Sequence, residues 1–165
     1  MSTPRWGEVR CLSRAGFHTI RYSEWGAADN PRVLLCLHGL TRVGADFAHL
    51  AENLSDRYRI VCPDVVGRGR SDWLADPMLY GLPQYSFDIT SLIARLNVDR
   101  VDLLGTSMGG LIGLSLAGQP NAPIGRLILN DIGPSMQLDA LLRIGDYVGR
   151  TPRFADLGQA TEYVR

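Results

Sequence analysis

The chain has 165 residues, of which 45% are hydrophobic and 21% are charged, and this composition is typical of one globular domain with a buried core. Seventeen basic residues balance seventeen acidic ones, so the composition does not favour a nucleic-acid partner. No apolar run approaches the roughly 18 residues that a membrane span needs, and the N-terminal residues lack the apolar core of a secretory signal.

Strands and helices alternate along most of the chain. Continuous apolar runs predict strands buried on both faces, and apolar residues at three- and four-residue spacing predict helices. The alternation indicates an α/β fold, with a mainly parallel sheet flanked by helices. In chain order, the expected elements are strands at Val9–Leu12 and Thr19–Trp25, a strand at Val33–Leu37, a helix at Ala45–Leu54, a strand at Tyr58–Cys62, a Gly- and Arg-rich loop at Val65–Pro83, a helix at Tyr85–Leu96, a strand at Arg100–Leu104, a helix at Leu111–Ala117 and a strand at Gly125–Asn130.

The cysteines indicate a reducing compartment. There are three, Cys11, Cys36 and Cys62, and no two have C-x-x-C spacing. Cys36 and Cys62 lie in strand-like apolar runs, which predicts buried thiols. We therefore expect a cytoplasmic protein.

The sequence Gly105-Thr106-Ser107-Met108-Gly109 stands between a predicted strand and a predicted helix. A Gly-x-Ser-x-Gly in this context is typical of a nucleophile elbow, in which the serine sits on a sharp turn at a helix N-terminus. In a chain with 18 glycines the pentapeptide alone is a weak signal, and a turn without chemistry is the alternative. Its context favours Ser107 as a nucleophile.

A second cluster, His38-Gly39-Leu40-Thr41, directly follows the strand at Val33–Leu37. Acyl transfer needs two N–H donors aimed at the oxygen that becomes negative. We expect these donors to be the backbone N–H groups of Met108 and Leu40. We interpret His38 as a structural residue that fixes this loop.

Three segments in this order, His38-Gly39, the segment from Asp64 to Asp72, and the Ser107 elbow, resemble the α/β-hydrolase fold superfamily. The resemblance covers Val9–Pro134 and is to the lid-bearing branch of serine hydrolases and esterases. It implies hydrolysis of a carboxylic ester, or else of an amide or a carbon–carbon bond, on a small-molecule substrate. A serine at position 107 argues against dehalogenases and epoxide hydrolases, whose nucleophile is an aspartate. No metal or organic cofactor is implied.

The same resemblance suggests further site residues. Asp131, which ends the last predicted strand, is a candidate for the catalytic acid, and its alternative role is to cap the segment that follows. Thr41, Arg42 and Trp73 are expected to line the mouth of the pocket, where Arg42 would favour a substrate carboxylate. An exposed Arg42 without such a role is the alternative.

The expected general base is missing from the pattern. In this fold the histidine follows the serine, whereas His18, His38 and His49 all precede Ser107. From Ser135 the pattern becomes helical, first with Leu138, Leu141, Leu142, Tyr147 and Val148 and then from Asp156 with Leu157, Ala160, Tyr163 and Val164. We therefore expect a core at 1–134 and the start of a helical lid at 135–165, with the rest of the fold or self-association completing the sheet. The alternative is a short protein that keeps the scaffold for binding or regulation without catalysis.

Overall fold

The structure is a computed structural model that describes residues 3–133, 142, 145–146, 148–149 and 152–163. The chain divides into two compact units, Met1–Ile132 and Gly133–Arg165. Each unit is described by itself.

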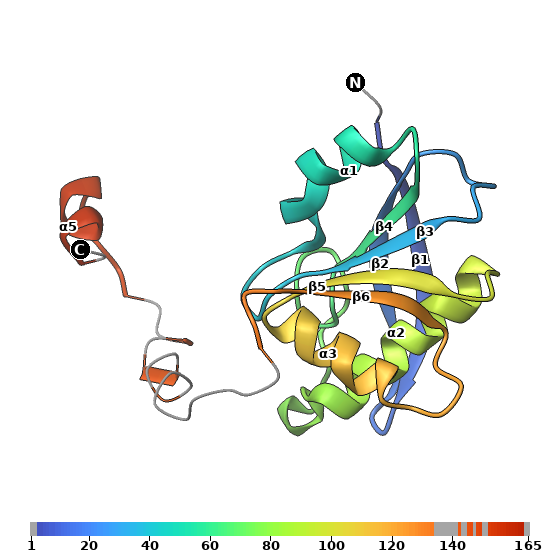
Figure 1. Ribbon diagram of the computed structural model, residues 1–165. Coiled ribbons are helices and arrows are strands. Elements are labelled where there is room, and N and C mark those ends of the chain that lie inside the picture. Colours follow the sequence, from blue (N-terminus) through green and yellow to red (C-terminus); the bar gives the residue numbers. More distant parts are fainter. Residues whose placement is uncertain (1–2, 134–141, 143–144, 147, 150–151, 164–165) are drawn as a thin grey trace. The chain divides into compact units, whose positions relative to one another are not determined.

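The first unit is built on a sheet (Figure 1), in which the described residues form six strands in the order β1-β2-β4-β3-β5-β6. Strand β2 is antiparallel to both neighbours, and β4, β3, β5 and β6 run parallel. The expected α/β fold with a mainly parallel sheet is therefore confirmed. The strands are β1 (Arg5–Ser13), β2 (Gly16–Trp25), β3 (Val33–Leu37), β4 (Arg59–Pro63), β5 (Val101–Thr106) and β6 (Ile124–Asn130).

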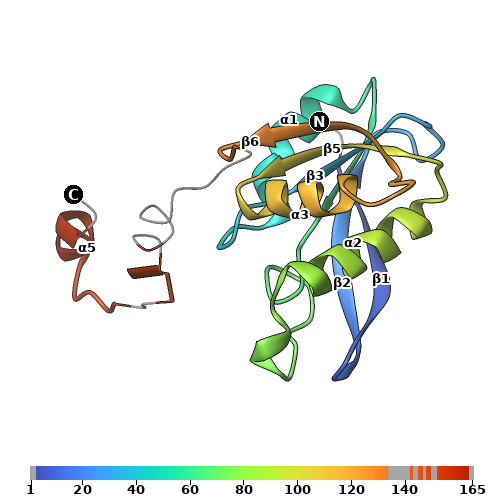
Figure 2. The same cartoon turned by 60° about the horizontal axis from the view of Figure 1, so that its bottom comes forward.

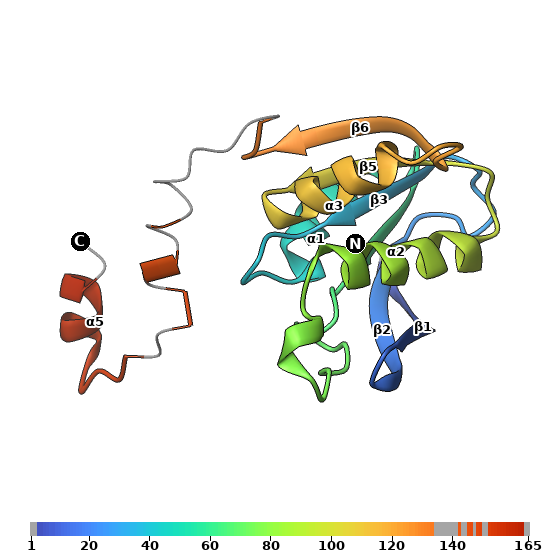
Figure 3. The same cartoon turned by 90° about the horizontal axis from the view of Figure 1, so that it is seen from below.

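Helices cover both faces of the sheet (Figure 3). One face packs against η1 and α1, where Phe47 of η1 and Ala51 of α1 meet buried residues of β3 and β4 such as Cys36 and Cys62. The other face packs against α2 and α3 and contains the larger cluster of buried side chains. All five residues of β3 are buried, as its continuous apolar run predicts. The helical elements of this unit are η1 (Gly44–Phe47), α1 (Ala48–Leu54), η2 (Pro77–Leu79), α2 (Leu82–Leu96) and α3 (Met108–Ala117).

The structure shifts several expected boundaries. Strand β1 begins at Arg5 rather than Val9, because its register with β2 continues to Glu24 beyond the apolar residues. The helix predicted at Ala45–Leu54 starts as the 3-10 turn η1. Helix α2 starts at Leu82, inside the predicted loop, because a proline is tolerated in the first helical turn.

Parallel pairing brings the carboxyl ends of β3, β4, β5 and β6 to one edge of the sheet. The segments that follow these strands begin at His38, Asp64, Ser107 and Asp131. Ligands of open α/β sheets bind at this edge. The fold therefore brings the separate sequence motifs to one place.

The second unit contains helix α5 (Leu157–Tyr163), which confirms the helix expected near Asp156 (Figure 2). The ring of Tyr163 packs 5.2 Å from that of Phe154, measured between centroids. Much of the expected helix from Ser135, including Leu138, Leu141 and Tyr147, lies outside the described residues. Across the described parts of both units, no helix combines the length and apolarity that crossing a membrane requires.

Strand β6 generates a prediction about association. Within the described residues it pairs with β5 alone, and Ile128 is 51% exposed. An unpaired apolar strand edge is a template for another chain. We expect residues 1–165 alone to associate in a concentration-dependent way in sizing chromatography with light scattering, and Ile128→Lys to reduce this. Phe87→Lys, which replaces an exposed apolar residue on helix α2 rather than on an edge strand, is the control. A monomer at all concentrations with a cooperative melt would contradict the prediction.

Candidate active site

Ser107 lies at the turn between β5 and α3 with φ 50° and ψ −114°. Within the part of the chain that the structure describes, the other non-glycine residues with positive φ are asparagines and an aspartate, which tolerate it better than serine. The N–H of Ser107 donates to the Asn130 carbonyl at 2.9 Å, and its carbonyl accepts from the N–H groups of Gly110 and Leu111. The strained turn is therefore held on both sides, as is common at functional sites.

Close packing explains the glycines of the elbow. A Cβ on Gly109 would lie 2.1 Å from the Leu37 carbonyl oxygen, and one on Gly105 would lie 2.4 Å from the Gly109 carbonyl oxygen. These neighbours are backbone atoms that cannot move aside alone. Only glycine allows α3 to start directly against the end of β3.

The segment after β3 forms a turn beside the serine. The N–H of Arg42 donates to the Gly39 carbonyl at 3.1 Å, which closes a four-residue turn with Leu40 and Thr41 at its centre. A Cβ on Gly39 would lie 3.8 Å from the Cβ of Ser107. The structure therefore brings this turn and Ser107 together. We name residues 39–42 the Gly39 turn.

His38 is buried and uses both ring nitrogens. Its Nε2 accepts a hydrogen bond from the Val65 N–H at 2.9 Å, so the ring proton is on Nδ1, which donates to the Gly39 carbonyl at 2.7 Å. Burial lowers the pKa of His38, which favours this neutral form. These contacts agree with its interpretation as the residue that fixes the loop.

The segment after β4 is organised by the buried carboxylate of Asp64, which the sequence analysis did not single out. It accepts from the N–H groups of Gly44 and Arg70, both at 2.8 Å. A Cβ on Gly69, where φ is +53°, would lie 2.2 Å from it. The signal in the sequence was an aspartate at a strand end followed by Gly67 and Gly69, and both glycines have the positive φ that a tight turn requires.

Arg68 was also missed as a site residue. Its Nε donates to the Leu40 carbonyl at 3.0 Å, and its Nη2 lies 3.8 Å from the Met108 sulfur. The guanidinium therefore contacts both residues that are expected to provide oxyanion donors. Because these contacts span up to 40 positions, no local pattern could have indicated them.

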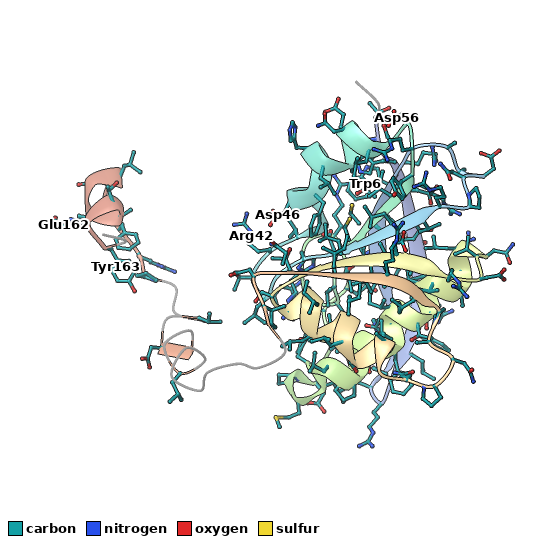
Figure 4. The ribbon with its side chains drawn as sticks, in the orientation of Figure 1. Trp6, Arg42, Asp46, Asp56, Glu162 and Tyr163 are labelled. Carbon is teal, nitrogen blue, oxygen red and sulfur yellow. The ribbon has the colours of Figure 1, made fainter. Side chains whose placement is uncertain are left out.

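The residues expected at the pocket mouth are all exposed. Thr41 is part of the Gly39 turn, and Trp73, 76% exposed, follows the loop around Asp64. Figure 4 shows Arg42 beside Asp46, and the Arg42 Nε donates to the Asp46 carboxylate at 2.6 Å. A substrate carboxylate at Arg42 would therefore compete with Asp46.

Asp131 directly follows β6 and is exposed, with φ 56°. Because the Ser107 N–H bonds to the carbonyl of Asn130, the backbones of Ser107 and Asp131 are close. Its place is compatible with either expected role, catalytic acid or cap.

The other two histidines lie on β2 and α1. The His18 Nε2 is 2.9 Å from the buried carboxylate of Asp88. His49 is exposed on α1, and its ring and carbonyl both lie within hydrogen-bonding distance of the Asn53 side-chain amide. A general base must lie within hydrogen-bonding reach of the nucleophile, and neither His18 nor His49 hydrogen-bonds to Ser107.

Cys11, His18 and Asp88 form the one cluster of possible metal ligands within the described residues, with ligand atoms within 4.8 Å of one another. Burial and the charge of Asp88 raise the pKa of Cys11 to about 12, which disfavours the thiolate that binds metals. Asp88 already accepts hydrogen bonds from His18 and Gln84. These contacts fit a structural link between β1, β2 and α2.

The alpha/beta hydrolase fold family matches residues 32–159, which is more than half of the chain. The chain belongs to the alpha/beta hydrolase family. The matched range contains the Gly39 turn, the loop around Asp64 and the Ser107 elbow.

The chain is similar to several known proteins along nearly its whole length. It is 54% identical over 164 residues to the 3-hydroxybutyrate-oligomer hydrolase of Cupriavidus necator, covering 99% of this chain and 56% of that protein. A crystal structure of a Rickettsia typhi protein matches with a TM-score of 0.87 at 35% identity, over 97% of this chain and 59% of that one. An alpha/beta hydrolase from Novosphingobium aromaticivorans matches with a TM-score of 0.78 at 38% identity. The match covers 90% of this chain and 52% of that one. The chain spans between half and three fifths of the length of these relatives.

The packing of the elbow predicts a sharp difference between a glycine at the start of α3 and the glycine that caps its end. Gly109→Ala should lower the free energy of unfolding by about 1–3 kcal/mol or more, because its Cβ would overlap the Leu37 carbonyl. Gly118→Ala should change this free energy by less than about 1 kcal/mol, because this C-cap of α3 has φ −75° and ψ −6° and its Cβ would lie 3.3 Å from the Leu114 carbonyl oxygen, where a small shift suffices. Urea unfolding of both variants measures this. Equal stabilities would contradict the tight contact.

Proposed function

We propose that this chain carries the nucleophile and oxyanion hole of a serine hydrolase that cleaves carboxylic esters. The observation that carries the proposal is the strained Ser107 at the start of α3 with the Gly39 turn against it. A serine in this backbone conformation is energetically unfavourable, and such strain is retained where it positions a reacting group.

In the proposed reaction, the Ser107 Oγ attacks the ester carbonyl carbon and gives its proton to a general base. The N–H groups of Met108 and Leu40 stabilise the negative oxygen of the tetrahedral intermediate. The first N–H groups of a helix lack intrahelical acceptors, and so do the central N–H groups of a four-residue turn. Cleavage of the C–O bond releases the alcohol, which takes the proton, and water then hydrolyses the acyl-serine.

The proposed substrates are esters of short hydroxy acids such as 3-hydroxybutyrate oligomers. The support is the 54% identity, over almost the whole chain, to a 3-hydroxybutyrate-oligomer hydrolase. Such oligomers end in a carboxylate, which would replace Asp46 as the partner of exposed Arg42 at the Gly39 turn. Thr41 and Trp73 would line the same mouth. A cytoplasmic location stays a prediction that rests on three buried free thiols.

We propose that the base is a histidine outside residues 1–165. His38 uses both ring nitrogens, His18 is buried against Asp88, and His49 is exposed on α1. Asp131 remains the candidate acid, and residues 135–165 are proposed to begin the lid. The remaining part of the fold is the proposed partner of the β6 edge.

The first test labels the nucleophile in a polypeptide that contains residues 1–165 together with the base. A fluorophosphonate should modify Ser107, and Ser107→Ala should abolish labelling and hydrolysis of p-nitrophenyl 3-hydroxybutyrate, because the attacking oxygen is gone. Mass spectrometry of the labelled peptide identifies the site.

Ser115→Ala is the matched control, since Ser115 is exposed on the same helix α3 and should leave labelling unchanged. Undiminished labelling of the Ser107→Ala protein would overturn the assignment. The absence of labelling, with retention of a small apolar ligand, would favour the alternative of a binding scaffold.

A second test uses residues 1–165 alone. Without a base, the chain should hydrolyse the same ester at least roughly 1000-fold more slowly than the longer polypeptide, because triad members act as a unit. Steady-state kinetics measures the ratio. Comparable rates would mean that a base lies within the chain, and His38→Asn would be the first variant to examine.

A further inference from the structure

Arg68 reaches from the loop around Asp64 to both sides of the proposed oxyanion hole. Its Nε donates to the Leu40 carbonyl at 3.0 Å, and its Nη2 lies 3.8 Å from the Met108 sulfur. One rigid guanidinium therefore contacts the Gly39 turn and the first residue of α3. These are the two segments whose N–H groups must converge on one oxygen.

The orientation of this guanidinium is fixed from its other side. Nη1 donates to the Val66 carbonyl at 2.8 Å and to the Tyr85 hydroxyl at 3.0 Å. The rings of Tyr85 and Tyr80 lie 5.2 and 5.8 Å from the guanidinium carbon, within the range of cation–π attraction. Arg68 is thus a preorganised group rather than a freely moving surface side chain.

The Gly39 turn has two peptide planes that need to be fixed. In a planar trans peptide the C=O and N–H groups point in opposite directions, so a bond to the carbonyl also aims the N–H. The Gly39 carbonyl accepts from His38 Nδ1 and from the Arg42 N–H, and this fixes the N–H of Leu40. The Leu40 carbonyl accepts from Arg68, and this fixes the next plane, which carries the N–H of Thr41.

The plane that Arg68 fixes is the central peptide of the turn. A flip of the central peptide is what distinguishes a type I from a type II turn, and it rotates the N–H between the two central residues. His38 cannot prevent this flip, because it bonds to the preceding plane. The bond from Arg68 to the Leu40 carbonyl opposes it.

Arg68 also places positive charge at this point. No carboxylate forms an ion pair with Arg68 among the described residues, whereas Arg21, Arg42, Arg59 and Arg126 all pair with one. An unneutralised cation beside Met108 favours charge that develops on a nearby oxygen.

We propose that Arg68 is a positioning residue of the oxyanion hole. Its bond to the Leu40 carbonyl holds the peptide that directly follows the proposed Leu40 donor and so keeps the Gly39 turn in one conformation, and its unpaired positive charge lies beside Met108. This inference rests on the proposed function. It assigns to Arg68 a kinetic effect on the chemical step that a residue supporting only the fold would lack.

The test compares Arg68→Met, Arg68→Lys and Arg70→Met in the polypeptide that contains residues 1–165 together with the base. Arg70 is the matched control, because its guanidinium stacks 3.8 Å from the Trp6 ring centre and its bond to Asp64 is made by the backbone N–H. The measurements are kcat and KM for p-nitrophenyl 3-hydroxybutyrate, the affinity for an alkyl boronic acid that forms a tetrahedral adduct with serine, and the melting temperature.

We expect Arg68→Met to lower kcat by roughly 10- to 100-fold, which does not exceed the fall in kcat caused by losing one oxyanion donor. KM should change less than about threefold. Boronate affinity should fall in parallel with kcat. Arg68→Lys should restore part of kcat, because it keeps the charge but lacks the fork that bridges Leu40 and Met108. Arg70→Met should leave kcat unchanged.

An Arg68→Met enzyme with kcat and boronate affinity within about twofold of the parent protein would overturn the proposal. So would a loss that Arg70→Met shares, or a fall in melting temperature with kcat per folded molecule unchanged. Activity in the Ser107→Ala protein would instead overturn the proposed function, so the two failures are distinguishable.

Discussion

The contact between the start of α3 and the end of β3 is the constraint on which the rest of this site depends. A Cβ on Gly109 would lie 2.1 Å from the Leu37 carbonyl oxygen, so the helix begins as close to the strand as a backbone can. This closeness forces the turn at Ser107 into its strained conformation and places the serine beside the Gly39 turn, which starts two residues after Leu37. The parallel sheet is rigid here, because β3 is buried on both faces.

Around this contact, the loops are held by polar groups that are themselves buried or fixed. Asp64 gathers the N–H groups of Gly44 and Arg70, and His38 links Gly39 to Val65. Buried polar groups that are fully hydrogen-bonded give a loop one conformation, whereas partly satisfied ones allow several. Arg68 extends the same network to Leu40 and Met108. Preorganisation of this kind is what an oxyanion hole requires, since its donors must be in place before the charge develops.

The division of roles among the histidines fits a chain that spans about half the length of its relatives. His18 joins β2 to α2 through Asp88, and His38 fixes the Gly39 turn. The hydrogen bonds of both histidines connect segments of the fold. The proposed nucleophile, the proposed donors and the network around them all follow the four parallel strands, whereas the proposed base lies elsewhere. The sheet edge proposed to carry the nucleophile can therefore be examined independently of the segment proposed to carry the base.

The sequence by itself determined the strands and helices of the first unit and the α/β class of the fold. The apolar run at Val33–Leu37, the helical spacing of α2 and the Gly-x-Ser-x-Gly of the elbow are local signals, because strand burial, helix amphipathicity and tight turns each depend on neighbouring residues. It also indicated Ser107 as the candidate nucleophile. Only the tertiary structure decided the contacts of Asp64 and Arg68, which connect positions 20 and up to 40 residues apart. A hydrogen bond between distant segments has no periodicity to read, since it exists only after the sheet has brought its carboxyl ends together.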